Sequence, residues 1–138
     1  MFAPDLLAGQ RILVTGGGSG LGAAMAARFA QLGARLVLCG RRVDRLDTTA
    51  VTLRATGADV QVLPCDVRDA AAVAAMVDAA WQQAPVDVLV NNAAATFIAR
   101  TERLSARAAD AILAPTLHGA LYCTLELGRR WIDNGRRG

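Results

Sequence analysis

The sequence has 138 residues, 54% of them hydrophobic, and a formal net charge of +3 at pH 7, which is typical of one domain with a sizeable core. No run approaches the roughly 18 consecutive apolar residues of a membrane-spanning helix, so we expect no membrane partner. All 15 basic side chains are arginine, which excludes a nucleoside-triphosphate loop ending in Gly-Lys-Ser/Thr.

The first half of the chain alternates between apolar runs and helical patterns. Residues 11–15 predict a strand, and 20–32 predict a helix with apolar side chains at spacings of three and four. A nearly continuous apolar run at 34–39 predicts a strand that is covered on both faces. A second helix is predicted over 43–55 and a third strand over 59–63.

The same alternation continues in the second half. A third helix is predicted over 69–83, capped by its first residue and ended by Pro85. A fourth strand is predicted over 86–90. A last long helix is predicted over 105–131, in which Pro115 is expected to disturb the hydrogen-bond ladder.

Strands that alternate with helices predict an α/β fold, here a Rossmann-like doubly wound parallel sheet with strand order 3-2-1-4. The fourth strand would then form a sheet edge with apolar residues on both faces, which isolated proteins avoid. We therefore expect residues 1–138 to be the cofactor-binding part of a single larger domain, truncated before the later strands, or to have this edge covered by a partner.

A glycine-rich turn, 15–22 (TGGGSGLG), joins the first strand to the first helix. Unpaired N–H groups and the helix dipole at such a junction suit a pyrophosphate. Gly16 would permit the tight turn, Gly18 and Gly20 the close approach of a dinucleotide, and Gly22 close packing of the helix. The alternative is a glycine-rich connection without a ligand.

Two arginines, Arg41 and Arg42, follow the second strand. Dinucleotide folds place an acidic residue near this point for NAD, or an arginine for the 2′-phosphate of NADP. Gly40 stands at the acidic position, and guanidinium groups bind phosphate well. We therefore predict NADP, with NAD as the less favoured cofactor, although the arginines could instead solubilise the loop or pair with Asp44.

The cysteines predict a reducing compartment, because Cys39, Cys65 and Cys123 are far apart and suit small core positions. The first residues carry Asp5 and no basic side chain, unlike a secretory or transit peptide, so we expect a cytoplasmic protein. With His118 as the single histidine, no metal site is expected.

A basic cluster lies near the C-terminus. Such a cluster can attract nucleic acid, but arginines are also favoured at a solvated helix end. The motifs of this chain lie elsewhere, so we expect no nucleic-acid partner. The cluster consists of Arg129, Arg130, Arg136 and Arg137.

Three motifs, each after a predicted strand, resemble those of the short-chain dehydrogenases/reductases. Residues 15–22 resemble the T-G-x-x-x-G-x-G cofactor motif, Asp66-Val67 the adenine-contacting pair, and 91–94 (NNAA) the N-N-A-G motif. The resemblance covers residues from about 10 to 131 and implies an oxidoreductase, with Asn91 tying neighbouring strands together. The implied cofactor-binding residues are Gly16, Gly17, Gly18, Ser19, Gly20, Leu21, Gly22, Arg41, Arg42, Asp66, Val67, Asn92, Ala93 and Ala94.

Shorter stretches resemble the 2,4-dienoyl-CoA reductase branch of this family, among them 65–69 and 101–105. That resemblance implies hydride transfer between NADPH and an unsaturated acyl-CoA, or a carbonyl or alcohol substrate, and a role in fatty acid metabolism. It also implies that Arg68 supplies charge for CoA phosphates, Phe97 an apolar wall, and Ser105 a contact near the acyl group. Capping of the last helix explains Ser105 equally well.

The family's catalytic tyrosine is followed four residues later by a lysine. Here Tyr122 is followed by Glu126 and the chain has no lysine, so we assign no catalytic residue and expect these 138 residues alone to be inactive. We interpret His118 as structural rather than as a proton relay. The alternative function is a non-catalytic NADP-binding or interaction module. The family's last long helix commonly packs against a second subunit, which implies a homo-oligomer.

Overall fold

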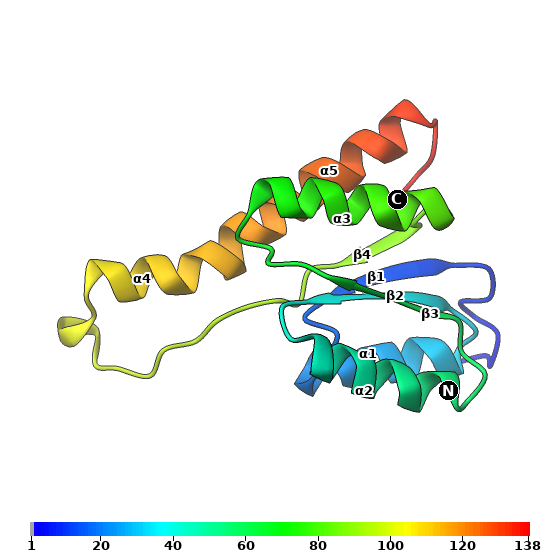
Figure 1. Cartoon of the computed structure of the whole chain (residues 1–138), viewed down its shortest axis with the longest axis horizontal. Helices are drawn as coiled ribbons and strands as arrows, with labels where there is room; N and C mark the ends of the chain where they lie inside the picture. The colour runs from blue at the N-terminus through cyan, green and yellow to red at the C-terminus, as the bar shows by residue number, and fades with distance from the viewer. Residues whose placement is uncertain (1) are drawn as a thin grey trace.

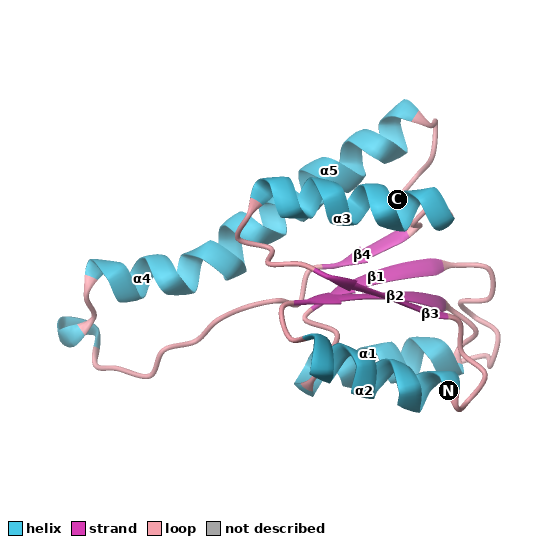
Figure 2. Cartoon of the chain, viewed as in Figure 1, coloured by secondary structure: helices cyan, strands magenta, loops and turns pink. Residues whose placement is uncertain are grey.

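A parallel sheet lies between two layers of helices in the computed structural model, which describes residues 2–138 (Figure 1). Helices α1 and α2 cover one face of the sheet, and α3 and α5 cover the other (Figure 2). The strands are β1 (Arg11–Thr15), β2 (Arg35–Gly40), β3 (Val60–Pro64) and β4 (Val88–Val90). The helices are α1 (Gly20–Gln31), α2 (Val43–Arg54), α3 (Ala70–Gln83), η1 (Thr101–Arg103), α4 (Ala106–Leu113), η2 (Ala114–His118) and α5 (Gly119–Asp133).

The strand order is β3-β2-β1-β4 and every pair is parallel, which confirms the predicted fold class. Strand β4 forms an edge and pairs with β1 over three residues. The predicted strand at 86–90 was therefore two residues too long. Just before β4, the Val86 carbonyl accepts a hydrogen bond from the Trp131 indole at 2.7 Å, and the N–H of Asp87 donates to the Arg11 carbonyl at 2.8 Å.

The core consists of two clusters, one on each face of the sheet. Leu13 and Val37 pack toward α3 and α5, while Ile12, Leu36 and Leu38 pack toward α1 and α2. Alternate residues of one strand thus enter opposite clusters, as the two-residue period of a strand requires. Because both faces are covered, the central strands are apolar between their polar end residues.

A buried arginine, which no sequence pattern predicted, lies at the amino end of β1. Arg11 is 2% exposed, and its guanidinium donates to the carbonyl of Ala80 at 2.7 Å, to that of Ala84 and to the Gln61 side chain. Carbonyls at the end of a helix lack partners within it, and a cation is favoured there. Burial lowers the pKa of Arg11, and these bonds compensate its charge.

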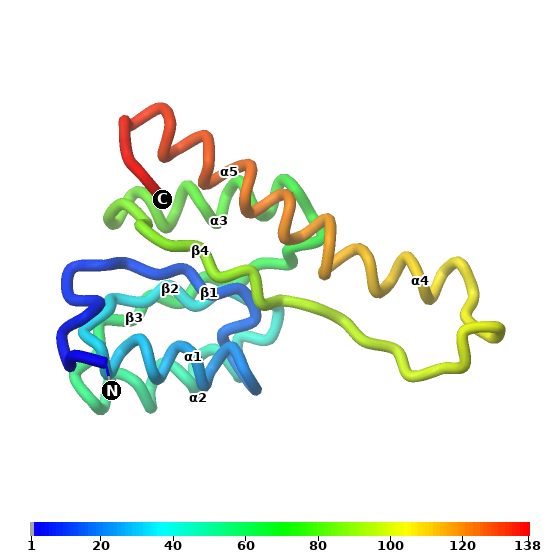
Figure 3. Tube along the Cα trace, turned by 180° about the vertical axis from the view of Figure 1, so that it is seen from behind, coloured from blue at the N-terminus to red at the C-terminus, as the bar shows by residue number. Residues whose placement is uncertain are grey.

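The last helix is continuous but changes form at Pro115, as predicted. Helix α4 leads into the π turn η2 and then into α5. Proline cannot donate to the ladder and its ring crowds the preceding turn, which favours a wider turn here. Helix α4 extends away from the sheet, while α5 packs on α3 (Figure 3). Among the described residues no helix is both long and apolar enough to cross a membrane.

The packing of α5 on the core can be tested with two leucines of the same helix. Leu127 is fully buried, whereas Leu125 is 44% exposed. Leu127→Ala is expected to lower the free energy of unfolding by about 2–5 kcal/mol, because it leaves a cavity. Leu125→Ala should change it by no more than about 0.5 kcal/mol. Urea unfolding followed by circular dichroism measures both, and equal losses would contradict this packing.

Candidate functional site

The turn between β1 and α1 is built on backbone that only glycine adopts easily. Gly16 has φ +70° and Gly20 has φ +54°. The N–H groups of Gly16 and Gly17 both donate to the carbonyl of Cys39, at 2.7 and 3.2 Å. These two bonds hold the glycine turn against β2. The first turn of α1, which follows, carries no acidic residue.

Gly22 lets the first turn of α1 approach this loop closely. A Cβ at Gly22 would overlap the Gly16 carbonyl oxygen and come within 2.6 Å of Asn92 Nδ2. Gly22 was expected to let the helix pack close to the sheet, and the neighbours that it approaches are the turn and Asn92. Gly18 packs against a different element, because its Cβ would lie 3.0 Å from the backbone nitrogen of Leu46 in α2.

A buried threonine joins the ends of β1 and β4. Thr15, 2% exposed, donates its hydroxyl to the carbonyl of Val90 and accepts from the N–H groups of Asn92 and Ala93, both at 3.0 Å. Asn92 in turn donates its side-chain amide to the Thr15 carbonyl at 2.9 Å. Asn91 was expected to tie strands together, but it donates to Thr124 of α5 at 3.0 Å instead.

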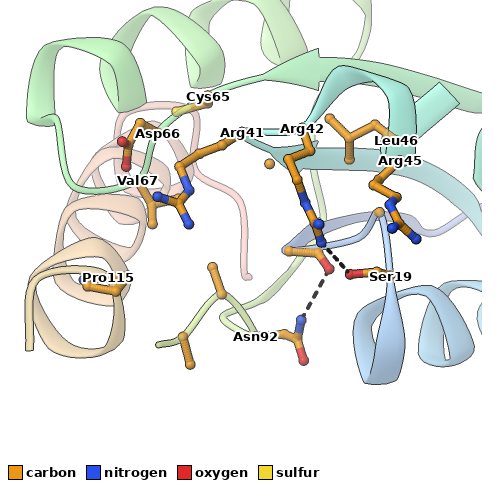
Figure 4. Close-up of a pocket in the computed structure, with 15 residues that line it drawn as sticks. Ser19, Arg41, Arg42, Arg45, Leu46, Cys65, Asp66, Val67, Asn92 and Pro115 are labelled. Carbon is orange, nitrogen blue, oxygen red and sulfur yellow. Dashed lines mark hydrogen bonds between the residues drawn. The ribbon is translucent and has the colours of Figure 1, made fainter. Parts of the chain in front are cut away.

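A cavity of about 260 Å³ lies where all four strands end (Figure 4). Its walls come from the segments that follow β1, β2, β3 and β4, because parallel strands bring their carboxyl ends to one edge of the sheet. Ten of the predicted cofactor residues line it. They are Gly16, Gly18, Ser19, Arg41, Arg42, Asp66, Val67, Asn92, Ala93 and Ala94.

The other predicted cofactor residues shape the turn rather than the wall. Gly17 faces Leu38, Gly20 has open space, Gly22 packs inside the turn, and the Leu21 side chain is 71% exposed. Five lining residues were not predicted. Arg45 and Leu46 lie three and four residues after Arg42, a spacing that places them on the same helix face and was a usable signal. The remaining three are Gly40, Cys65 and Pro115.

Arginine side chains dominate the charge of the cavity. Arg42 donates to the Ser19 hydroxyl at 3.4 Å, while Arg41 extends toward Asp66 (Figure 4). Asp44 pairs with Arg45 at 3.9 Å, and in residues 2–138 it forms no ion pair with the two predicted arginines. Arg42 also precedes α2 as its cap residue without a side-chain cap bond, so the positive end of that helix dipole adds to the cavity.

Asp66 is held by Arg68 through several hydrogen bonds. Arg68 Nε donates to both carboxylate oxygens, at 2.9 and 3.0 Å, and its Nη2 donates to Oδ2 at 2.5 Å. The backbone N–H of Arg68 donates to Oδ1 at 3.1 Å. These hydrogen bonds hold the pKa of Asp66 below its ordinary value. Arg68, which was predicted to face CoA phosphates, lies on this carboxylate.

Phe97 and Ser105 lie at a second cavity, of about 270 Å³, between the loop after β4 and helix α4. Its lining is largely apolar and includes Ala111 and Ile112. The Ser105 hydroxyl accepts from the N–H of Ala108 at 3.2 Å, so its predicted role as a helix cap is confirmed. Arg68 does not line this cavity.

The cysteines are buried and unpaired, as predicted for core residues. The neighbouring Cys65 thiol and burial raise the pKa of the Cys39 thiol, and burial raises the pKa of Cys123 to about 12. Both thiols are therefore protonated near neutral pH.

Carboxylates neutralise most of the C-terminal arginine cluster. Arg129 pairs with Glu126 at 2.9 Å, Arg136 pairs with Asp87 at 2.5 Å, and Arg130 pairs with Asp78. At the cavity, Arg41 and Arg42 form no ion pair with a carboxylate of residues 2–138.

A parallel sheet of order 3-2-1-4, with a glycine turn leading into a helix at its carboxyl edge, defines a Rossmann-like α/β domain, the class that binds dinucleotides there. The profile of the family described as short chain dehydrogenase matches residues 10–138. The chain therefore belongs to the short-chain dehydrogenase family, and this membership implies NAD or NADP as cofactor.

Known relatives and structures agree with this placement. An uncharacterized oxidoreductase of Caenorhabditis elegans is 46% identical over 136 residues, covering 96% of this chain and 44% of that protein. A probable 2,4-dienoyl-CoA reductase of the same organism is 40% identical, with coverages of 93% and 42%. The citronellol catabolism dehydrogenase of Pseudomonas aeruginosa PAO1 superposes with a TM-score of 0.88 at 34% identity, covering 94% of this chain and 54% of that one. The chain spans about half the length of these proteins.

The close approach at Gly22 leads to a stability prediction. Gly22→Ala is expected to lower the free energy of unfolding by about 1–3 kcal/mol, because the added methyl group must displace the turn. Gly128→Ala is the control, since this helical position has open space around it. The control should raise stability by about 0.5–1 kcal/mol. Denaturant titration measures both, and a neutral Gly22→Ala would contradict the described packing.

The Asp66–Arg68 pair leads to a pH prediction. Arg68→Ala is expected to raise the pKa of Asp66 toward the ordinary value of about 3.9, because the charged form loses its donors. Carboxyl carbon chemical shifts followed against pH measure this. Because the folded-state pKa is lowered, the pair stabilises the fold at neutral pH, and this contribution is lost as the pH falls through the pKa of Asp66. An unchanged pKa in the variant would contradict the pairing.

Proposed function

We propose that the chain is the NADP-binding part of a short-chain oxidoreductase that transfers hydride between NADPH and an unsaturated acyl-CoA, or a carbonyl or alcohol substrate. NADP is favoured over NAD because arginines line the cavity after β2, and because Gly40 stands where an NAD site would have a carboxylate. NADPH supplies the hydride when it is bound. The residues described above bind and orient it.

The glycine turn fits a pyrophosphate. The first N–H groups of α1 have no partners within the helix, and no acidic side chain in that first turn opposes an anion. Because Gly16 and Gly18 have no Cβ, the cavity wall there consists of backbone, which a ligand can approach closely. Helix α1 would therefore hold the diphosphate bridge of the cofactor.

The arginines fit the phosphate that distinguishes NADP from NAD. Arg41, Arg42 and Arg45 line the cavity beside the Ser19 hydroxyl, and the N-terminal end of α2 adds positive potential. Guanidinium groups bind phosphate with two parallel donors. We assign the 2′-phosphate to this group.

The remaining walls fit the adenine and the ribose. Asp66 and Val67 form the wall after β3, and we assign the adenine to them. The segment after β4 is fixed by Thr15, and Ala93 and Ala94 leave room for a ribose beside the backbone. Each of these assignments is a proposal about the cofactor pose.

The substrate class is supported by relatives named as 2,4-dienoyl-CoA reductases and by the second cavity. Phe97 offers an apolar wall for an acyl group, and Ser105 lies at the same cavity. Arg68, which the resemblance assigns to the CoA phosphates, is bound to Asp66 and lines neither cavity, so we propose no CoA contact for it. On the proposed substrate class, the protein acts in fatty acid metabolism.

We further propose that these residues are the cofactor-binding part of a larger domain and are inactive by themselves. The support is the length of the relatives and the lack of a Tyr-x-x-x-Lys motif in the 138 residues.

Exposed Leu117, Leu121 and Leu125 support a homo-oligomer formed through the last helix. The same apolar face also favours the second candidate, a non-catalytic NADP-binding module that docks on a partner. The unpaired buried cysteines support a cytoplasmic location.

Cofactor choice tests the proposed function. Arg41→Ala is expected to weaken NADP binding by about 1.5–3 kcal/mol, the typical value for hydrogen bonds to a charged group. NAD binding should change little, because NAD lacks the 2′-phosphate. Isothermal titration calorimetry with both cofactors measures this.

The control variant is Arg28→Ala, which removes the same charge from α1, where Arg28 bonds Gln31. It should leave the ratio of the two affinities unchanged. Equal losses for NADP and NAD in Arg41→Ala would contradict recognition of the 2′-phosphate. If the unmodified chain binds neither cofactor, the proposed function is wrong.

A further inference from the structure

Asp66 is the one acidic side chain among the described residues that line the cofactor cavity, whose wall also carries Arg41, Arg42 and Arg45. Arg41 extends toward it, and this neighbouring charge also favours the ionised carboxylate (Figure 4). A carboxylate on a short side chain can rotate toward any nearby guanidinium. Its direction is therefore decided by the partner that binds it most firmly, and here that partner is Arg68.

The backbone that carries this pair is fixed from three sides. The N–H of Cys65 donates to the Gly40 carbonyl at 2.9 Å, which ties the segment to β2. Val67 is 6% exposed and packs so closely on α5 that a Cβ at Gly119 would lie 2.6 Å from its side chain. Asp69 accepts from two N–H groups at the start of α3. With the backbone fixed, Arg68 determines the orientation of the carboxylate.

Arg68 leaves part of the carboxylate free for a ligand. An ionised carboxyl group offers about four lone-pair positions on its two oxygens and donates nothing. Arg68 donates three N–H groups to the carboxylate, two from its side chain and one from its backbone, so about one lone-pair position remains. Asp66 itself lines the cavity, and its side chain is 32% exposed. The carboxylate accepts a hydrogen bond from a donor group inside the cavity, and it repels an acceptor group.

We propose that Arg68 is a positioning residue that aims the Asp66 carboxylate at the exocyclic amino group of adenine, so that the cavity selects adenine over a base with a carbonyl at that position. This inference rests on the proposed function, because it needs the adenosine part of the cofactor in this cavity. A site built to receive a hydrogen bond from a ligand discriminates strongly against an analogue that lacks the donor. Without Arg68, the carboxylate is free to turn to Arg41 and the selection is lost.

The test compares NADPH with its hypoxanthine analogue, in which a carbonyl replaces the amino group. Calorimetry on the 138-residue chain gives the ratio of the two affinities. We expect a preference for NADPH of about ten-fold or more, as for one hydrogen bond to a charged group. Arg68→Ala is expected to make the two affinities nearly equal, as is Asp66→Asn. Removal of the Arg68 charge weakens both ligands alike, so the ratio isolates recognition of the base.

Two further variants sharpen the comparison. Arg68→Lys keeps the charge but not the planar fork, so its ratio should fall well below that of the unmodified chain. Arg28→Ala should keep the full preference. The inference is overturned if Arg68→Ala retains the preference while Asp66→Asn loses it, or if the unmodified chain binds both ligands equally. If the unmodified chain binds neither ligand, the proposed function itself fails.

Discussion

The hydroxyl group of Thr15 uses every hydrogen bond that a hydroxyl can make, and the site depends on it. It donates once, to Val90, and accepts twice, from the N–H groups of Asn92 and Ala93. One buried atom thereby fixes the end of β1, the end of β4 and the segment that follows β4. Asn92 extends this connection to the glycine turn through the Thr15 carbonyl. Two walls of the cavity where the strands end thus share a single anchor.

The two ends of the sheet are stabilised in opposite ways. At the amino end of β1, the Arg11 guanidinium donates to carbonyls at the end of α3, so the charge at this end of the sheet is compensated within the protein. At the carboxyl end, α1 and α2 begin with N–H groups that no side chain caps. Three arginines add to that positive edge. A parallel sheet collects these features at one edge because every strand runs in the same direction.

Much of the fold could be predicted because its signals are local. Apolar runs and the capping residues Asp69 and Ser105 located the strands and helices to within about two residues, and Pro115 marked the irregular turn. The exceptions depend on distant contacts. The carbonyl of Val86, just before β4, accepts a hydrogen bond from the indole of Trp131, which lies 45 residues later in the sequence.

The site shows the same division between local and distant signals. The strand-end motifs located ten residues of the cavity wall, and the helical spacing after Arg42 was sufficient to find Arg45. Pro115 comes from a helix late in the chain, and only the tertiary packing of α5 on α3 brings it to the wall. The partner of Asp66 was two residues away in the sequence, but a sequence does not distinguish an arginine that meets a ligand from one that binds its neighbour.

Every positive side chain at the cofactor cavity is a guanidinium, because the sequence contains no lysine. A guanidinium does not lose its proton in water at any pH a folded protein tolerates, so alkaline solution leaves these charges in place. No side chain here can form an imine with an aldehyde or ketone, nor be acylated as a lysine would be. The arginines therefore offer a bound anion charge and hydrogen bonds rather than an amine nucleophile.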